Sequence, residues 1–232
     1  AAGDPSLLRV AQVDYVKPEQ MQSQEFGYRG KLSRTFTVDA AVYRNDFQDF
    51  INTQVVLSPL YGEVGDGGLS VLAMANGDFE TWSSYTNSPA EISSWGVSIG
   101  AQTKIFGNFD LSANYTKSKL EFEQSLYPDF RTNWNTPEHK IKAQFGNTQL
   151  FENFGFNVAW RYWSEYLWQA SFGDGMVPET HVIDAQFNLT VPKWKSVIKV
   201  GATNLGGEEY FTAFGSGFIG TQYYISWTAN NF

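Results

Sequence analysis

Aromatic side chains in the long connections between the predicted strands are the chain's best candidates for binding chemistry. Their faces stack on sugar rings and planar chelates, and they bury a large area for few rotatable bonds. The alternative is that they pack loop against loop or form an aromatic belt at a membrane interface. The candidate ligand-contacting residues are Tyr61, Trp82 and Tyr85 in the first long connection, Tyr166, Trp168 and Phe172 in the third, and Phe211 and Phe214 in the last.

Charged residues on the polar face of the predicted strands form a second candidate set. They could line an aqueous lumen and hold whatever fills it, or they could pair with one another across adjacent strands, which is the simpler arrangement. The candidate lumen-facing charges are Asp39, Asp110, Lys140, Lys142, Arg161, Asp184 and Lys199.

Catalytic and metal chemistry are not indicated. The acidic pairs Glu208–Glu209 and Glu121/Glu123 lie in or beside loops without other catalytic groups, unlike the carboxylate pairs of glycosidases. His139 and His181 have no cysteine and no second close ligand to complete a metal site. No nucleophile elbow or phosphate-binding loop occurs. We therefore expect no enzyme activity, no metal and no cofactor.

Composition narrows the class of protein. Aromatic residues make up 17% of the 232 residues, and charged residues also make up 17%, below the roughly 25% of soluble domains. Hydrophobic residues reach 42%, yet the mean hydropathy is −0.32, so apolar and polar residues are interleaved. The net charge of −8 argues against a nucleic-acid partner. No apolar run approaches the roughly 18 residues of a membrane helix.

Strict alternation of apolar and polar residues recurs nine times and predicts nine strands. Trp95, Val97 and Ile99, which alternate with serine and glycine, show the pattern most clearly. Alternation fits both a soluble sandwich and a membrane barrel. The predicted segments are 25–32, 36–43, 94–102, 109–116, 140–145, 154–162, 183–189, 198–203 and 222–229.

The connections between these segments alternate in length. Short links are expected at 31–35, 106–108, 148–153 and 191–195, and long ones at 52–90, 117–136, 164–180 and 204–219. Short periplasmic turns and long extracellular loops are typical of outer-membrane barrels. We therefore predict an all-β fold, a transmembrane antiparallel β-barrel that crosses the bacterial outer membrane many times.

The odd strand number bears on domain organisation, because single-chain bacterial barrels close with an even number. We expect residues 1–232 to be the C-terminal portion of one barrel domain, incomplete as given. Residues 1–20 would lead in from an extracellular loop, and 21–232 would supply strands, turns and loops. The alternative is a tenth strand within 7–16, which would complete a small barrel.

Two stretches resemble one family. Residues 17–19 read Lys-Pro-Glu, 25–30 read Glu-Phe-Gly-Tyr-Arg-Gly, and 39–43 read Asp-Ala-Ala-Val-Tyr. Residues 204–210 read Asn-Leu-Gly-Gly-Glu-Glu-Tyr, and 220–224 read Gly-Thr-Gln-Tyr-Tyr before the terminal Phe232. In order, spacing and position they resemble TonB-dependent outer-membrane receptors.

The resemblance implies about nine C-terminal strands of a barrel of roughly 22 strands. Such receptors hold an N-terminal plug, absent here, and draw energy through TonB to import scarce nutrients such as iron chelates, cobalamin, glycans or peptides. The implied partners are outer-membrane lipid, the rest of the barrel, the plug, TonB through that plug, and in some relatives a surface lipoprotein.

The chain's end departs from the family pattern. Tyr224 and Phe232 are the candidate C-terminal assembly signal, but polar residues stand at three positions where the family has apolar ones. A bulge near residues 230–231 would restore the phase. Two other functions stay open: a structural or docking barrel subunit without its own transport, and a soluble lectin-like β-sandwich.

Overall fold

The computed structural model describes residues 8–65 and 67–229, which cluster into two compact units. Unit 1 combines Ala1–Gln22, Asp46–Ser93 and Glu121–Asn133, and unit 2 combines Ser23–Asn45, Ser94–Leu120 and Trp134–Phe232. Each unit is described by itself.

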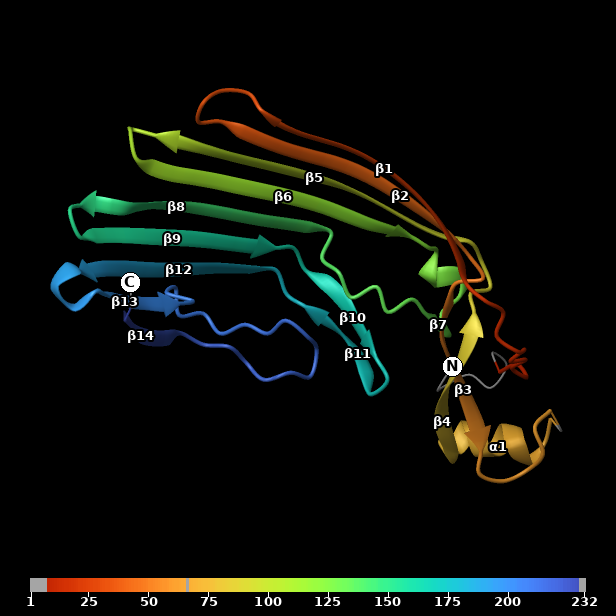
Figure 1. Ribbon diagram of the computed structural model, residues 1–232. Helices are drawn as coiled ribbons and strands as arrows, with labels where there is room; N and C mark the ends of the chain where they lie inside the picture. Colours follow the sequence, from red (N-terminus) through yellow and green to blue (C-terminus); the bar gives the residue numbers. More distant parts are fainter. Residues whose placement is uncertain (1–7, 66, 230–232) are drawn as a thin grey trace. The chain divides into compact units, whose positions relative to one another are not determined.

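A nine-stranded antiparallel sheet lies mostly in unit 2 (Figure 1). All nine predicted segments are strands, and the spatial order of the strands follows their order in the sequence. The strands are β1 (Gln20–Lys31), β2 (Thr37–Gln48), β5 (Ile92–Ile105), β6 (Phe109–Glu121), β8 (His139–Phe151), β9 (Phe154–Trp163), β12 (Thr180–Val191), β13 (Ser196–Thr203) and β14 (Gln222–Ala229).

The registers place apolar residues opposite apolar ones. Leu111 on β6 faces Phe145 on β8, which faces Val158 on β9. The row continues through Ala185 on β12 and Ala202 on β13. Because side chains alternate between the two faces of a strand, this register gathers the apolar residues on one face of the sheet.

The apolar face remains open to its surroundings even in the middle of the sheet. Ile99, Phe187 and Val200 are 50%, 52% and 50% exposed. A soluble sheet would bury such residues against a second layer. The exposure is what a lipid-facing wall requires, since the bilayer covers that face.

Tight turns close one end of the sheet at the four expected links. Leu32 donates its amide to Phe36, and Lys195 donates to Pro192 within a short 3-10 helix, η3 (Pro192–Trp194). The link between β8 and β9 is shorter than the predicted 148–153. A bulge after Asn147 shifts the register so that Phe151 pairs with Phe154 and only residues 152–153 turn.

The long connections are folded rather than irregular. In unit 1, β4 (Phe79–Asn87), β3 (Ile51–Pro59) and β7 (Phe130–Arg131) form a three-stranded sheet in that order. Helix α1 (Leu69–Asn76) connects β3 to β4 and ends at Gly77, whose φ of 80° suits a glycine. A 3-10 helix, η2 (Gln124–Leu126), precedes β7.

In unit 2, the third long connection forms a hairpin of β10 (Tyr166–Ala170) and β11 (Gly173–Val177). The fourth contains a single bridge between Tyr210 and Ile219. Residues 8–19 carry no strand, so the described part of 7–16 does not supply the alternative tenth strand. Among the described residues, no helix is long and apolar enough to cross a membrane.

Candidate functional site

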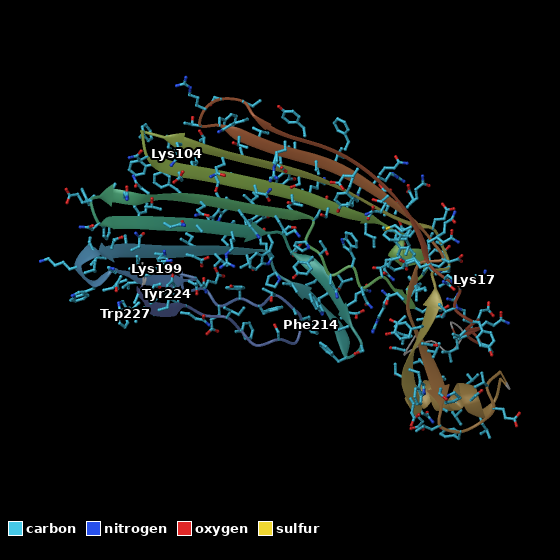
Figure 2. All side chains as sticks on the ribbon, viewed as in Figure 1. Lys17, Lys104, Lys199, Phe214, Tyr224 and Trp227 are labelled. Carbon is cyan, nitrogen blue, oxygen red and sulfur yellow. The ribbon has the colours of Figure 1, made fainter. Side chains whose placement is uncertain are left out.

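The third and fourth long connections bring the predicted aromatic residues of unit 2 together. Phe214, which is labelled in Figure 2, packs its ring on Gly175 of β11, where a Cβ atom would lie 2.2 Å from the ring. Trp168 is directly opposite Gly175 in the hairpin and therefore projects from the same face. Tyr166 donates a hydrogen bond of 2.7 Å to the carbonyl of Thr212. These contacts hold the hairpin against residues 211–218.

The remaining aromatic residues extend this loop cluster. A Cβ atom on Gly215 would lie 2.8 Å from Phe172, whose ring is nevertheless 70% exposed. Phe211 meets Phe218 edge to face at 5.5 Å. Phe218, 67% exposed, belongs to the cluster although it was not among the predicted residues. Phe218 could have been predicted by the same criterion as the others, because it too is an aromatic residue in a long connection.

Burial affects the ionisation of Tyr166 in the loop cluster. It raises the pKa of the Tyr166 phenol, because the ionised form loses water there. The phenol is protonated at physiological pH and donates its hydrogen bond to Thr212.

The predicted aromatic residues of unit 1 do not form one surface. Tyr61 donates to Asp78 at 3.0 Å and accepts from Asn76 at 3.2 Å, so its hydroxyl holds the connection between β3 and β4. Trp82 and Tyr85 on β4 are 57% and 68% exposed. They stand three residues apart in one strand and therefore project from opposite faces.

The predicted charges lie on the polar face of the nine-stranded sheet, and part of the set is paired. Asp39 pairs with Arg29 at 2.8 Å, Asp110 with Lys104 at 3.0 Å, and Asp184 with Arg161 at 2.9 Å. Arg29 and Lys104 complete the pairs although sequence reasoning did not single them out. All three pairs are partly exposed, so each contributes modestly to stability.

Three lysines of the set have no ion-pair partner among the described residues: Lys140, Lys142 and Lys199. Lys142 stands at a register position between Asn114 on β6 and Arg161 on β9. Lys140 is on the same face of β8, two positions away. The polar face therefore carries unneutralised positive charge, which attracts carboxylates or other anions.

The Arg161–Asp184 pair also anchors the fourth long connection. Asp184 accepts the backbone N–H of Asn204 at 3.0 Å as well as the guanidinium of Arg161. Asn204 is 2% exposed, and its side chain donates to the carbonyl of Glu208 at 2.7 Å. Thr221, at the far end of the connection, donates to the carbonyl of Asn204 at 2.7 Å. Both ends of the connection thus meet at Asn204.

The candidate assembly signal is described in part. Tyr224 on β14 projects from the polar face, extends across Gly201 and donates to Gln186 at 2.9 Å. Phe232 lies outside the described residues.

The histidines occupy aromatic stacks. His139 shares a 2.8 Å hydrogen bond with the hydroxyl of Tyr115, and His181 stacks on Trp160 at 5.9 Å. Within the described ranges, no group of three or more His, Cys, Asp or Glu side chains could hold a metal ion.

The family described as "TonB dependent receptor-like, beta-barrel" matches residues 2–205 of the chain. No curated protein matches the chain by sequence.

Solved structures share its fold. The copper transporter OprC is 16% identical, with a TM-score of 0.65 over 92% of this chain and 31% of that one. The ferric-catecholate import receptor Fiu from E. coli K12 is 15% identical, with a TM-score of 0.62 over 94% and 30%. FpvAI in its complex with pyocin S2 is 10% identical, with a TM-score of 0.64 over 97% and 28%. The chain thus spans less than a third of each of these proteins.

Proposed function

The chain belongs to the TonB-dependent receptor family, whose β-barrel part it matches, and from that premise we propose that it forms the C-terminal wall of a transporter importing a scarce nutrient across the bacterial outer membrane. The candidate nutrients are an iron chelate, cobalamin, or a glycan or peptide. Neither the docking subunit nor the soluble sandwich is favoured by the family match.

The observation that carries the proposal is the two-faced sheet. Its apolar face, with Phe187 and Val200 half exposed, suits lipid. Its polar face, with Asp184 paired to Arg161 and Lys142 unpaired, suits an aqueous lumen containing a polar plug. In this arrangement the tight turns face the periplasm, and the four long connections face the outside.

The binding role falls to the outward connections. The rings of Phe172 and Phe218 are exposed. The contacts of Tyr166 and Phe214 hold the connections that carry these rings against each other. These rings can stack on a sugar or a planar chelate at little cost in ordering. On the lumen side, Lys140 and Lys142 are available to pair with carboxylates of the plug. The plug would transmit the action of TonB.

Uptake by cells tests the proposal. A bacterium lacking its own copy receives the complete receptor and is grown with labelled ferric chelates, cobalamin, glycans or peptides as the limiting nutrient. We expect uptake of one class that requires both the receptor and TonB. Uptake of none of them, or uptake that persists without TonB, would contradict the transport function.

A matched pair of variants links uptake to the proposed surface. Phe172→Ala removes an exposed ring of the loop cluster, whereas Phe106→Ala removes a ring that is 88% exposed in a tight turn at the other end of the sheet. We expect the first variant to lower uptake and the second to leave it unchanged.

A further inference from the structure

Residues 8–17 of unit 1 form an extended strap without helix or strand, fastened near both of its ends. Near its start, the Arg9 guanidinium contacts both carboxylate oxygens of Asp129 at 3.2 Å. At its end, the Lys17 amide donates to the side chain of Asn87 at 2.7 Å, and Asn87 donates back to the Lys17 carbonyl at 2.9 Å. Tyr15, between these fastenings, is 100% exposed.

The first part of the strap borders an apolar cavity of about 340 Å³. Strand β3 and helix α1 supply the opposite walls through Val55, Leu57, Val71 and Met74. Leu8 and Val10 of the strap complete the lining. A cavity of this kind suits a compact apolar group, such as an aromatic ring with a short chain.

The rest of the strap borders a second cavity, of about 480 Å³, with a polar lining. Asp14 of the strap and Asp49 line it, together with Lys17 and the side chains of Thr86 and Ser88. Neither carboxylate has an ion-pair partner among the described residues, whereas Asp129 is already engaged by Arg9. The unpaired charge of this cavity is therefore predominantly negative.

Arg9, Val10, Ala11 and Asp129 are common to the linings of both cavities. The two spaces are therefore adjacent compartments of one site, divided by the Arg9–Asp129 pair. An apolar compartment beside an acidic one fits a molecule with an apolar body and a cationic end.

We propose that unit 1 binds small amphipathic organic amines under the strap, with the apolar body beside Val71 and Met74 and the ammonium group near Asp14 and Asp49. All of its walls belong to unit 1, so binding at this site can be measured without a transport assay. Loop aromatics such as Trp82 and Tyr85 take no part in either lining.

The probe for the test is tryptamine, an indole ring with a two-carbon ammonium chain. The complete receptor in detergent micelles is titrated with tryptamine, and binding is followed by saturation-transfer NMR. Indole-3-propionate, which carries a carboxylate on the same ring and chain length, is titrated in parallel. We expect saturable binding of tryptamine and much weaker binding of indole-3-propionate.

Two variants test whether tryptamine binds beside the carboxylates of Asp14 and Asp49. The double variant Asp14→Asn, Asp49→Asn should weaken tryptamine binding by about fivefold or more, because both favourable charges are removed. The control is Glu80→Gln on β4, an exposed carboxylate in the lining of neither cavity, which should change nothing. Asp14 and Asp49 line an open cavity and have no ion pair to lose, so the double variant should fold.

Any of three results would overturn the proposal. One is the absence of saturable tryptamine binding to the intact receptor. The second is binding of indole-3-propionate as strong as that of tryptamine, and the third is tryptamine binding of unchanged strength in the double variant. TonB-dependent uptake is a separate measurement, so failure here is distinguishable from failure of the transport function.

Discussion

The hydroxyl of Tyr224 on β14 reaches Gln186 on β12 across the intervening strand β13, where Gly201 leaves room for the ring. The same arrangement recurs on the same face of the sheet. Tyr43 on β2 crosses Gly96 on β5 and donates to Ser118 on β6 at 3.3 Å. In both places a tyrosine covers a glycine and ties together strands that are not direct neighbours.

Gly201→Ala should destabilise the barrel, because its Cβ would lie 2.5 Å from the Tyr224 hydroxyl and 2.8 Å from the backbone carbonyl of Ala185. We expect a loss of about 1–3 kcal/mol in the free energy of unfolding. Tyr224→Phe keeps the ring and should cost about 1 kcal/mol. The measurement is urea unfolding of the complete receptor in micelles.

Gly100→Ala is the matched control, because its Cβ would meet nothing closer than 3.4 Å. It should leave the unfolding midpoint nearly unchanged. An equal loss of unfolding free energy for Gly100→Ala and Gly201→Ala would show that the close contacts over Gly201 do not cause the loss.

Phe187→Arg tests the lipid-facing side of the sheet. Phe187 is half exposed and pairs with Phe156 and Val200. An arginine there should cost about 2–4 kcal/mol if the residue lies near the bilayer midplane. The readout is the amount of folded, heat-modifiable receptor in outer membranes.

Asn188→Asp places a charge one residue away on the polar face, directly opposite Lys199, and should assemble normally. Normal assembly of both variants would argue against lipid contact at Phe187.

Asp184→Asn should loosen the fourth long connection, because it removes the charge that holds Arg161 and weakens the acceptor for the Asn204 amide. We expect hydrogen exchange of residues 205–219 to accelerate by about tenfold, equivalent to about 1.4 kcal/mol. Asp110→Asn breaks the Lys104 pair instead and should leave these amides unchanged. Equal protection in all three proteins would contradict the anchoring role of Asp184.

Acid should release the start of the strap. Burial raises the pKa of Asp129, but hydrogen bonds from its own amide, Arg9 and Gln54 and the charge of Arg9 outweigh it, so the pKa lies below the ordinary 3.8. A lowered carboxyl pKa stabilises the folded form above the ordinary value, and that stabilisation disappears as pH falls through the folded pKa.

A nitroxide label on Tyr15→Cys, read by electron paramagnetic resonance, reports this release. We expect the label's mobility to increase below about pH 4. Asp129→Asn should give mobile spectra at every pH. If the spectra of the Asp129→Asn variant still change with pH, a group other than Asp129 causes the response.

Phe214→Ala should separate the two folded connections of unit 2, since its ring fills the space over Gly175. We expect faster proteolysis within 166–177. Phe218→Ala removes an exposed ring of the same cluster and should leave the hairpin's proteolysis unchanged. Equal cleavage of the two variants would show that Phe214 is not the anchor.

Several features of the site were predictable from the sequence. Alternation placed Asp184, Arg161 and Lys142 on one face, because side-chain direction in a strand depends on position alone. Alternation could not predict that Arg161 pairs with Asp184 or that Lys142 has no ion-pair partner among the described residues, because ion pairing depends on the register between strands. Tyr61 was predicted as a ligand contact, and the structure shows its hydroxyl hydrogen-bonded to Asp78 and Asn76.

Alternation and turn residues are local properties, so the nine strands of the large sheet, their two faces and the approximate places of the tight turns could be predicted from the sequence. The folds of the long connections depend on tertiary contacts. Helix α1 and the hairpins within them are short, and their stability depends on contacts with distant residues such as those between Phe214 and Gly175. The cavities beside the strap arise from residues far apart in the chain, such as Arg9 and Asp129, and no local pattern specifies how such residues meet.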